Sequence, residues 1–294
     1  MKKLLILSGK GGTGKTTVAS AFIKLHNAKV YADCDVDAPN LHLVTNQGIK
    51  PKNSDYYGLP KAKIDNLLCV RCGICMQHCR FDAIYKAEVY KVNEYQCEGC
   101  GVCELVCPNK AVTLQPDIAG QLTLYDDSEV FSTAQLKMGR GTSGLLVSEV
   151  KKQITSPSIK TDLAIIDGSP GIGCPVIASI KGVDMVLVVA EPSVSGLSDI
   201  KRIIKTAEKF QVKTALCINK YDLNLEKSKE IERYCDKKQI FFAGRIPFDD
   251  KAVKVVNSGK NIVDCDGEAA EAIKDIFNSV YGRINGYKHT PNED

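Results

Sequence analysis

Cysteines supply the clearest chemical signal in this 294-residue chain, because eight of its thirteen fall into two short runs with one spacing. The runs are Cys69-x2-Cys72-x2-Cys75-x3-Cys79 and Cys97-x2-Cys100-x2-Cys103-x3-Cys107. Three thiolates spaced in this way can occupy three corners of an iron–sulfur cubane within a short stretch of chain. The fourth corner must then be filled from elsewhere, so the spacing predicts two [4Fe–4S] sites.

The two runs resemble those of bacterial two-cluster ferredoxins, in which the fourth cysteine of each run binds the other cluster. The resemblance implies one cluster on Cys69, Cys72, Cys75 and Cys107, and a second on Cys97, Cys100, Cys103 and Cys79. Gly73, Gly99 and Gly101 lie between these ligands, where the backbone has to turn tightly around the inorganic core.

Zinc and disulfide bonds are the alternative uses of these cysteines. Structural zinc prefers separated pairs of ligands, four for each ion, and it has no need of a third cysteine in each run. A disulfide framework is typical of small secreted chains, whereas this chain begins with a charged and apolar strand, and its number of cysteines is odd. The other cysteines are scattered and are expected to be small packed hydrophobes: Cys34, Cys174, Cys217, Cys235 and Cys265.

A second motif lies at the start of the chain, where residues 9–16 read GKGGTGKT and match the phosphate-binding pattern G-x-x-x-x-G-K-[ST]. An expected strand precedes the loop and an expected helix follows it, so backbone N–H groups and the helix N-terminus can surround phosphates. Lys15 should neutralise the β- and γ-phosphates of a nucleotide, and Thr16 should bind Mg²⁺ through its hydroxyl. The expected nucleotide contacts in this segment are Gly11, Gly12, Thr13, Gly14, Lys15, Thr16 and Thr17.

Lys10 makes this loop more specific, because K-G-G-x-G-K-T-T resembles the deviant Walker A loop of the MinD/Mrp/nitrogenase-iron-protein class of P-loop ATPases. In that class the additional lysine reaches the nucleotide of a partner subunit, so two subunits enclose ATP face to face. The resemblance therefore implies a homodimer with ATP, in which Lys10 acts in trans as an arginine finger does.

Two acidic segments resemble the switch regions of the same family. Residues 33–41 resemble switch I, and the resemblance implies that Asp35 orients the attacking water and the Mg²⁺ shell, with support from Asp33. Residues 163–171 resemble a Walker B strand that runs into switch II, so Asp167 is expected to hold a water on Mg²⁺. A single Asp at a strand end is often a helix cap or a solvated turn. Three acidic positions in the register of the family make that alternative the weaker one.

The base is expected to bind near residues 219–222, which read NKYD and follow an expected strand. This pattern also fits the N-K-x-D motif of GTPases, in which the Asp selects guanine. In MinD-like proteins the corresponding Asn and a later Ile-Pro pair flank adenine, and the resemblance assigns these roles to Asn219 and Pro247. ATP is therefore preferred, and GTP remains the alternative.

The pattern of apolar segments predicts an α/β fold with a doubly wound, mostly parallel sheet of the P-loop NTPase type and an inserted small α+β ferredoxin domain. Strands are expected at 3–8, 29–33, 122–125, 130–132, 163–166, 185–190, 213–218 and 240–246. Helices are expected at 16–25, 143–153, 173–181, 197–210, 226–237, 249–257 and 268–280. Residues 51–60 are expected to be a loop. The predicted domains are 1–60 and 117–285 for the ATPase, 61–116 for the ferredoxin, and a polar tail at 286–294.

Composition narrows the class of protein further. A hydrophobic share of 44% and a charged share of 25% are ordinary for a globular chain, and no apolar run is long enough to span a bilayer. Two oxidised clusters with their thiolates add about −2 each, which brings the formal charge of +4 close to zero. No basic stripe indicates nucleic acid. Exposed low-potential clusters and free thiols favour the cytoplasm. We also expect no stable membrane anchor, because the last residues lack an apolar face.

These motifs favour an ATP-hydrolysing dimeric switch with ATP, Mg²⁺ and two [4Fe–4S] clusters as cofactors. Its nucleotide state would gate electron transfer to a partner metalloprotein, or the assembly and maturation of that partner's cluster. Fully ligated clusters favour electron transfer, since a delivery site needs incomplete coordination. The alternative is a spatial regulator like MinD or ParA that uses its clusters structurally.

Cys174 is a separate and speculative candidate, seven residues after Asp167. In the nitrogenase iron protein, a cysteine at the matching place is one of two in each subunit that hold a cluster on the dimer axis. The other precedes a Gly-Arg-Gly, but here residues 139–141 follow Lys137 and Met138. A stable bridging cubane is therefore not expected. Cys174 is either a packed or exposed thiol, or half of a transient metal or cluster site.

Overall fold

The computed structural model describes residues 1–45, 48 and 50–286, and these divide into two compact units. The sheet unit comprises residues 1–53, 123–134 and the chain from 143 onward. The cysteine unit comprises residues 54–122 and 135–142, and it contains both cysteine runs. The second unit thus interrupts the first along the chain. The predicted tail at 286–294 lies, apart from its first residue, outside the described residues.

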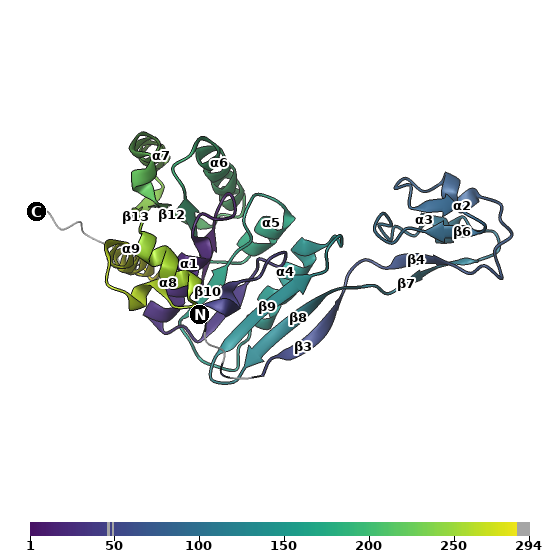
Figure 1. Cartoon of the computed structure of the whole chain (residues 1–294), viewed down its shortest axis with the longest axis horizontal. Coiled ribbons are helices and arrows are strands. Elements are labelled where there is room, and N and C mark those ends of the chain that lie inside the picture. Colours follow the sequence, from purple (N-terminus) through teal and green to yellow (C-terminus); the bar gives the residue numbers. More distant parts are fainter. Residues whose placement is uncertain (46–47, 49, 287–294) are drawn as a thin grey trace, which may run out of the picture. The chain divides into compact units, whose positions relative to one another are not determined.

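Within the described residues, a nine-stranded sheet has the order β13-β12-β11-β1-β10-β2-β9-β8-β3 (Figure 1). Its strands are β1 Lys2–Leu7, β2 Val30–Asp33, β3 Lys52–Tyr57, β8 Ile118–Asp126, β9 Val130–Leu136, β10 Leu163–Asp167, β11 Met185–Ala190, β12 Lys213–Asn219 and β13 Phe241–Ile246. Neighbouring strands are parallel from β13 through β9. The expected doubly wound, mostly parallel sheet is therefore confirmed.

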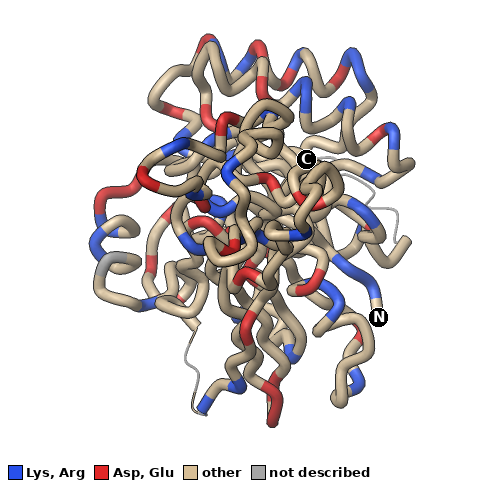
Figure 2. Tube along the Cα trace, turned by 90° about the vertical axis from the view of Figure 1, so that its right-hand side faces the viewer, with Lys and Arg blue, Asp and Glu red and all other residues tan. Residues whose placement is uncertain are grey.

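Helices separate the parallel strands along the chain. They are α1 Lys15–His26, α4 Ser143–Gln153, α5 Cys174–Ile180, α6 Val194–Lys209, α7 Leu225–Lys238, α8 Asp250–Asn257 and α9 Glu268–Ile284. Several begin at side-chain caps, as α6 does where Ser193 accepts a hydrogen bond from the backbone N–H of Gly196. No helix within the described residues is long and apolar enough to cross a membrane. Figure 2 shows acidic and basic residues interspersed along the trace rather than gathered by sign.

Strand β1 lies in the middle of this sheet and is buried on both faces. Leu4 and Ile6 belong to an apolar cluster with α1 and α9, in which the rings of Phe22 and Phe277 meet edge to face at 5.1 Å. Leu5 is also fully buried, although its side chain points to the opposite face. Each such leucine contributes about 1.5–3 kcal/mol through burial. This packing anchors the loop that leaves the carboxyl end of β1.

The cysteine unit contains two small antiparallel pairs and two short helices. Strand β4 (Lys61–Ile64) pairs with β7 (Val112–Gln115), and β5 (Ile84–Lys86) pairs with β6 (Tyr90–Val92). Helices α2 (Ile74–Gln77) and α3 (Val102–Leu105) each follow a glycine within a cysteine run. Its buried core is small and includes two of the predicted ligands: Ala62, Cys75, Ala83, Ile84, Tyr90, Cys97 and Val112.

The prediction of a loop at 51–60 was wrong for most of that segment, because Lys52–Tyr57 forms β3. The segment reads KNSDYY, and only Tyr56 is buried. A strand at the end of a sheet has a single neighbour and can remain polar, so it lacks the apolar pattern by which a central strand is recognised. Strand β8 likewise begins at Ile118, before the expected start at residue 122.

Candidate functional site

The phosphate-binding loop joins the carboxyl end of β1 to the start of α1. Gly14 caps α1 with φ of 89°, and a Cβ there would lie 2.2 Å from the side-chain nitrogen of Asn219, so only glycine fits. The same amide nitrogen of Asn219 donates a hydrogen bond to the carbonyl of Thr13 at 2.7 Å. Asn219 ends β12, which is separated from β1 by β11 alone, so its side chain fastens the loop to another strand of the sheet.

Lys15, Thr16 and Asp167 form a compact polar group behind this loop. The ammonium of Lys15 lies 2.5 Å from Oδ1 of Asp167, and Thr16 donates to Oδ2 of the same carboxylate at 2.6 Å. Burial disfavours the charged form of Lys15, but the charge and the hydrogen bond of Asp167, together with the charges of Asp33 and Asp35, outweigh burial and raise the lysine pKa. Parallel pairing of β1 with β10 aligns Ile6 with Asp167, which brings the carboxylate to the loop.

The switch I segment is arranged around Asp33 at the end of β2. Its carboxylate accepts backbone N–H groups from Asp35 at 2.9 Å, Asn40 at 2.9 Å and Leu41 at 3.0 Å. Burial and the nearby charge of Asp167 raise the pKa of Asp33 to about 7. Asp33 thus holds the turn that carries Asp35.

A cavity of about 1060 Å³ lies between the loop and switch I, and Lys10, Lys15, Thr16 and Asp35 are among its lining residues. Burial raises the pKa of Asp35, while the positive charge of Lys15 opposes that shift. Hydroxyl and carboxylate oxygens are the ligands that Mg²⁺ prefers. The oxygens of Thr16 and Asp35, with Asp167 hydrogen-bonded to Thr16, therefore fit the predicted ion.

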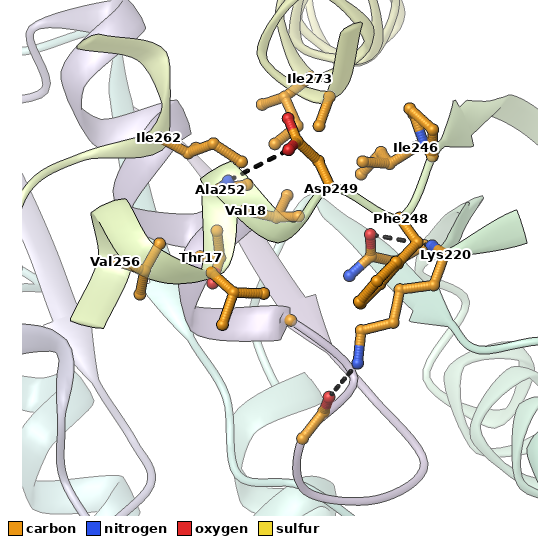
Figure 3. A pocket seen from close by; sticks show the side chains of 16 residues that line it. Thr17, Val18, Lys220, Ile246, Phe248, Asp249, Ala252, Val256, Ile262 and Ile273 are labelled. Atoms are coloured by element: carbon orange, nitrogen blue, oxygen red, sulfur yellow. Dashed lines mark hydrogen bonds between the residues drawn. The ribbon is translucent and has the colours of Figure 1, made fainter. Parts of the chain in front are cut away.

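A second cavity, of about 200 Å³, shares Gly12, Gly14 and Thr17 with the first and is drawn in Figure 3. Its walls are largely apolar and come from α1, the end of β13, α8, the short 3₁₀ helix Ile262–Asp264 and α9: Val18, Ile246, Ala252, Val256, Ile262 and Ile273. Asn219 and Pro247, the predicted base contacts, also line this cavity. Its size and apolar walls suit the flat face of a base.

Asp222, the residue that would select guanine in a GTPase, has a structural partner. Its Oδ1 accepts a hydrogen bond from the backbone N–H of Phe248 at 2.8 Å. Phe248 and Pro247 follow β13 and line this second cavity. The carboxylate therefore holds the segment that carries Pro247.

Glu191 was not among the predicted site residues, although it lies beside the phosphate-binding loop. One carboxylate oxygen is 2.7 Å from the ammonium of Lys10, and the other is 3.5 Å from that of Lys220. Burial favours the neutral acid, but the two lysines outweigh this and hold the pKa of Glu191 below its usual range. Its position directly after β11 was an available signal, because polar groups at the carboxyl ends of parallel strands gather at one edge.

The eight cysteines of the two runs surround two cavities in the cysteine unit. One cavity is lined by Cys69, Cys72, Cys75 and Cys107, and the other by Cys79, Cys97, Cys100 and Cys103. Each cavity thus draws three thiols from one run and its fourth from the other run. Among the residues that the structure describes, no three His, Cys, Asp or Glu side chains form a group that could hold a single metal ion, whereas each thiolate of a [4Fe–4S] site binds a different iron atom.

These cavities fit iron–sulfur clusters in their chemistry and in their backbone. Cysteine thiolates are the ligands of such clusters, and hydrogen bonds to sulfur tune them. Backbone N–H groups point at two of the sulfurs, from Ala111 to Cys107 at 3.2 Å and from Ala62 to Cys97 at 3.5 Å. Gly99 has φ of 62°, and a Cβ there would lie 2.2 Å from the carbonyl oxygen of Pro60.

The scattered cysteines differ in exposure. Cys34, Cys217 and Cys235 are buried, and burial raises the pKa of each thiol to about 12, so they are inert packed groups. Cys174 is exposed at the start of α5, next to Gly144 of α4. It is therefore accessible, unlike those three.

Comparison with known proteins agrees with this geometry. Residues 4–262 match the family model described as the CobQ/CobB/MinD/ParA nucleotide binding domain. An uncharacterised protein of Methanocaldococcus jannaschii is 33% identical over 95% of this chain and 96% of its own length. An iron–sulfur cluster carrier protein of Pyrococcus furiosus is 24% identical over 97% of this chain and 88% of its own. An uncharacterised ferredoxin of M. jannaschii is 32% identical over 30% of this chain and 61% of its own.

Among solved structures, a chain of the MinC:MinD cell division protein complex of Aquifex aeolicus superposes with a TM-score of 0.57. The match covers 100% of this chain and 99% of the other at 19% identity, so it supports the fold. The family match, the phosphate-binding loop and the four-cysteine cavities lead to one assignment. The chain belongs to the CobQ/CobB/MinD/ParA family of nucleotide-binding domains and carries an inserted ferredoxin-like domain.

Proposed function

We propose that the protein is an ATP-hydrolysing switch that works as a homodimer and controls electron flow from two [4Fe–4S] clusters to a partner metalloprotein. The nucleotide part rests on the loop and on the two acidic switches that converge on it. In this proposal Lys15 and the loop N–H groups bind the phosphates, while Thr16, Asp35 and Asp167 bind Mg²⁺ directly or through water. Mg²⁺ would neutralise the charge that develops on the transferred phosphoryl group.

We propose a homodimer because Lys10 belongs to the deviant loop and lines the larger cavity, of about 1060 Å³, between the loop and switch I. Its side chain is 41% exposed, so it can reach beyond its own subunit. A lysine delivered by a partner would stabilise the transferred phosphoryl group in the manner of an arginine finger. Hydrolysis would then require two copies of the chain.

The observation that carries the redox part is the division of eight cysteines between two cavities of four. A [4Fe–4S] cluster with four cysteine ligands is coordinatively complete, which suits a fixed electron carrier better than a cluster that has to leave. The competing function is maturation of a partner's cluster, and the similarity to an iron–sulfur cluster carrier protein supports that function. The two uses differ in whether iron moves.

Labelled iron separates these two uses. The protein would be reconstituted anaerobically with ⁵⁷Fe, reduced with dithionite, and mixed with MgATP and a partner captured from native anaerobic lysate. We expect the partner to be reduced only with ATP, while the ⁵⁷Fe stays with this chain. Transfer of ⁵⁷Fe to the partner would establish cluster delivery instead. Reduction of the partner without ATP would contradict the proposal that the nucleotide controls electron transfer.

Cys174→Ser is an informative variant in the same assay, because Cys174 is exposed just after switch II. If paired Cys174 thiols form a transient site, the variant keeps both clusters and ATP hydrolysis but loses ATP-dependent transfer. Unchanged transfer would leave the inserted domain as the redox site. Cys217→Ser is a matched control, since that thiol is buried within β12.

A further inference from the structure

The ammonium group of Lys10 is held by a carboxylate of its own chain. Its nitrogen lies 2.7 Å from Oε2 of Glu191, and the two side chains are 41% and 20% exposed. The backbone of Lys10 is anchored separately, because the hydroxyl of Ser8 donates to its carbonyl at 2.8 Å. The side chain is therefore the part of Lys10 that can change its partner without a movement of the loop.

Glu191 is itself in a fixed position. It follows β11 directly, and its carbonyl accepts a hydrogen bond from the N–H of Ser193 at 2.8 Å, at the start of α6. Gly196 packs so closely that a Cβ there would lie 2.4 Å from the same carbonyl oxygen. The carboxylate therefore stands on a rigid turn, and it cannot follow Lys10 far.

The second oxygen of Glu191 faces Lys220 at 3.5 Å. Lys220 in turn donates to the carbonyl of Gly12 in the phosphate-binding loop at 3.2 Å, as Figure 3 shows. One carboxylate thus serves two lysines at the rim of the nucleotide site, and both contacts favour its ionised form. Removal of the charge on Glu191 would leave Lys220 with its carbonyl partner, whereas Lys10 would lose its ion pair.

We propose that Glu191 is a positioning residue that retains Lys10 in its own subunit until the phosphates of a partner-bound nucleotide compete for it. The inference rests on the proposed function, in which Lys10 acts in trans. A carboxylate that followed Lys10 to a triphosphate would be repelled by the phosphate charges, so the pair has to break when the dimer forms. Glu191 thereby raises the protein concentration at which ATP produces a dimer.

Glu191→Gln tests this role, because it keeps the shape of the side chain and removes its charge. Dimerisation of the holoprotein would be measured by sedimentation with Mg²⁺ and a nonhydrolysable ATP analogue. A partly exposed ion pair of this kind changes an equilibrium by about two- to fivefold. We expect the dimer dissociation constant, and the protein concentration for half-maximal hydrolysis, to fall by that factor. The rate constant at saturating protein should stay within about twofold.

Three companion variants make the result specific. Glu232→Gln is a matched control, since it removes the same charge from a pair with Arg245 on α7 and β13. Glu191→Asp keeps the charge but shortens the side chain, and it should fall between wild type and the Gln variant. In a Lys10→Gln background, Glu191→Gln should have no further effect on dimerisation.

The proposal is overturned if Glu191→Gln leaves dimerisation unchanged or weakens it, or if it lowers the rate at saturating protein. Thermal melts of each variant identify any loss of folding. If Glu191→Gln does not fold, the effect of Glu191→Asp on dimerisation decides the question. Failure of the proposed function gives a different signature. In that case Lys10→Ala hydrolyses ATP at the wild-type rate. If Lys10→Ala is slow but Glu191→Gln leaves dimerisation unchanged, only the role of Glu191 is removed.

Discussion

Lys15 and Asp167 form a buried ion pair in which Nζ and Oδ1 are 2.5 Å apart, with side-chain exposures of 6% and 0%. The remaining oxygen of Asp167 accepts the hydroxyl hydrogen of Thr16 at 2.6 Å. Two residues at the start of α1 therefore share one carboxylate at the end of β10. The pair links the phosphate-binding loop to the strand that leads into switch II.

Lys15→Ala should lower stability as well as nucleotide affinity, because it leaves Asp167 buried without a counter-ion. Loss of one member of a buried pair costs about 3–5 kcal/mol. Urea denaturation without nucleotide measures this cost. Lys2→Ala is the control, since its pair with Asp184 is exposed and should contribute about 1 kcal/mol or less. Equal stability of the two variants would contradict a structural role for the buried pair.

Lys10→Ala should reduce ATP hydrolysis by about 3–5 powers of ten if Lys10 acts in trans like an arginine finger. ATP binding should survive better than in Lys15→Ala, because Lys15 contacts the phosphates in its own subunit. Phosphate release measures the rate of ATP hydrolysis, and titration calorimetry measures the affinity for ATP. A variant that hydrolyses ATP at the wild-type rate would remove the trans mechanism.

Cys72→Ser should damage one cluster far more than the other, since Cys72 lines the cavity with Cys69, Cys75 and Cys107. Anaerobic wild-type protein should contain about eight iron atoms and eight acid-labile sulfides for each chain. After dithionite reduction, electron paramagnetic resonance should report two interacting centres in the wild type and one in the variant. Stoichiometric zinc without such signals would contradict the clusters and favour structural zinc, which is the alternative use of these cysteines.

Removal of iron by a chelator should unfold the cysteine unit while the sheet unit stays folded. The buried core of the cysteine unit is small and includes Cys75 and Cys97, so without clusters little apolar burial opposes chain entropy. Hydrogen exchange should increase across residues 54–122 and remain slow in β1 and β10. Continued protection of 54–122 in the iron-free protein would mean that the clusters are not needed for folding.

Asp222 allows the choice between adenine and guanine to be tested. Asp222→Asn keeps an oxygen that can accept the N–H of Phe248, so we expect nearly wild-type KM for ATP. Asp222→Ala loses this hydrogen bond, which is worth about 0.5–1.5 kcal/mol, and should raise the KM for ATP by about two- to tenfold. GTP should compete weakly with ATP in all three proteins. Strong GTP binding that disappears in Asp222→Asn would identify a guanine site instead.

Local sequence was sufficient for the parts of the protein whose function depends on neighbouring residues. The loop that ends in Lys15 and Thr16 is contiguous, and three ligands of each predicted cluster lie within seven residues of one another. Continuous apolar runs identified the central strands, because such strands are buried on both faces. These features follow from short-range geometry and from burial, which the residue pattern records directly.

Tertiary structure alone decided the contacts between residues far apart in the chain. Glu191 meets Lys10, and Asp222 meets Phe248, only because parallel strands bring their carboxyl ends to one edge of the sheet. The polar strand Lys52–Tyr57 was missed because an edge strand is held by backbone pairing, which leaves little trace in side-chain type. A residue pattern reports what is buried, whereas the partner of each charged group depends on how the strands are ordered.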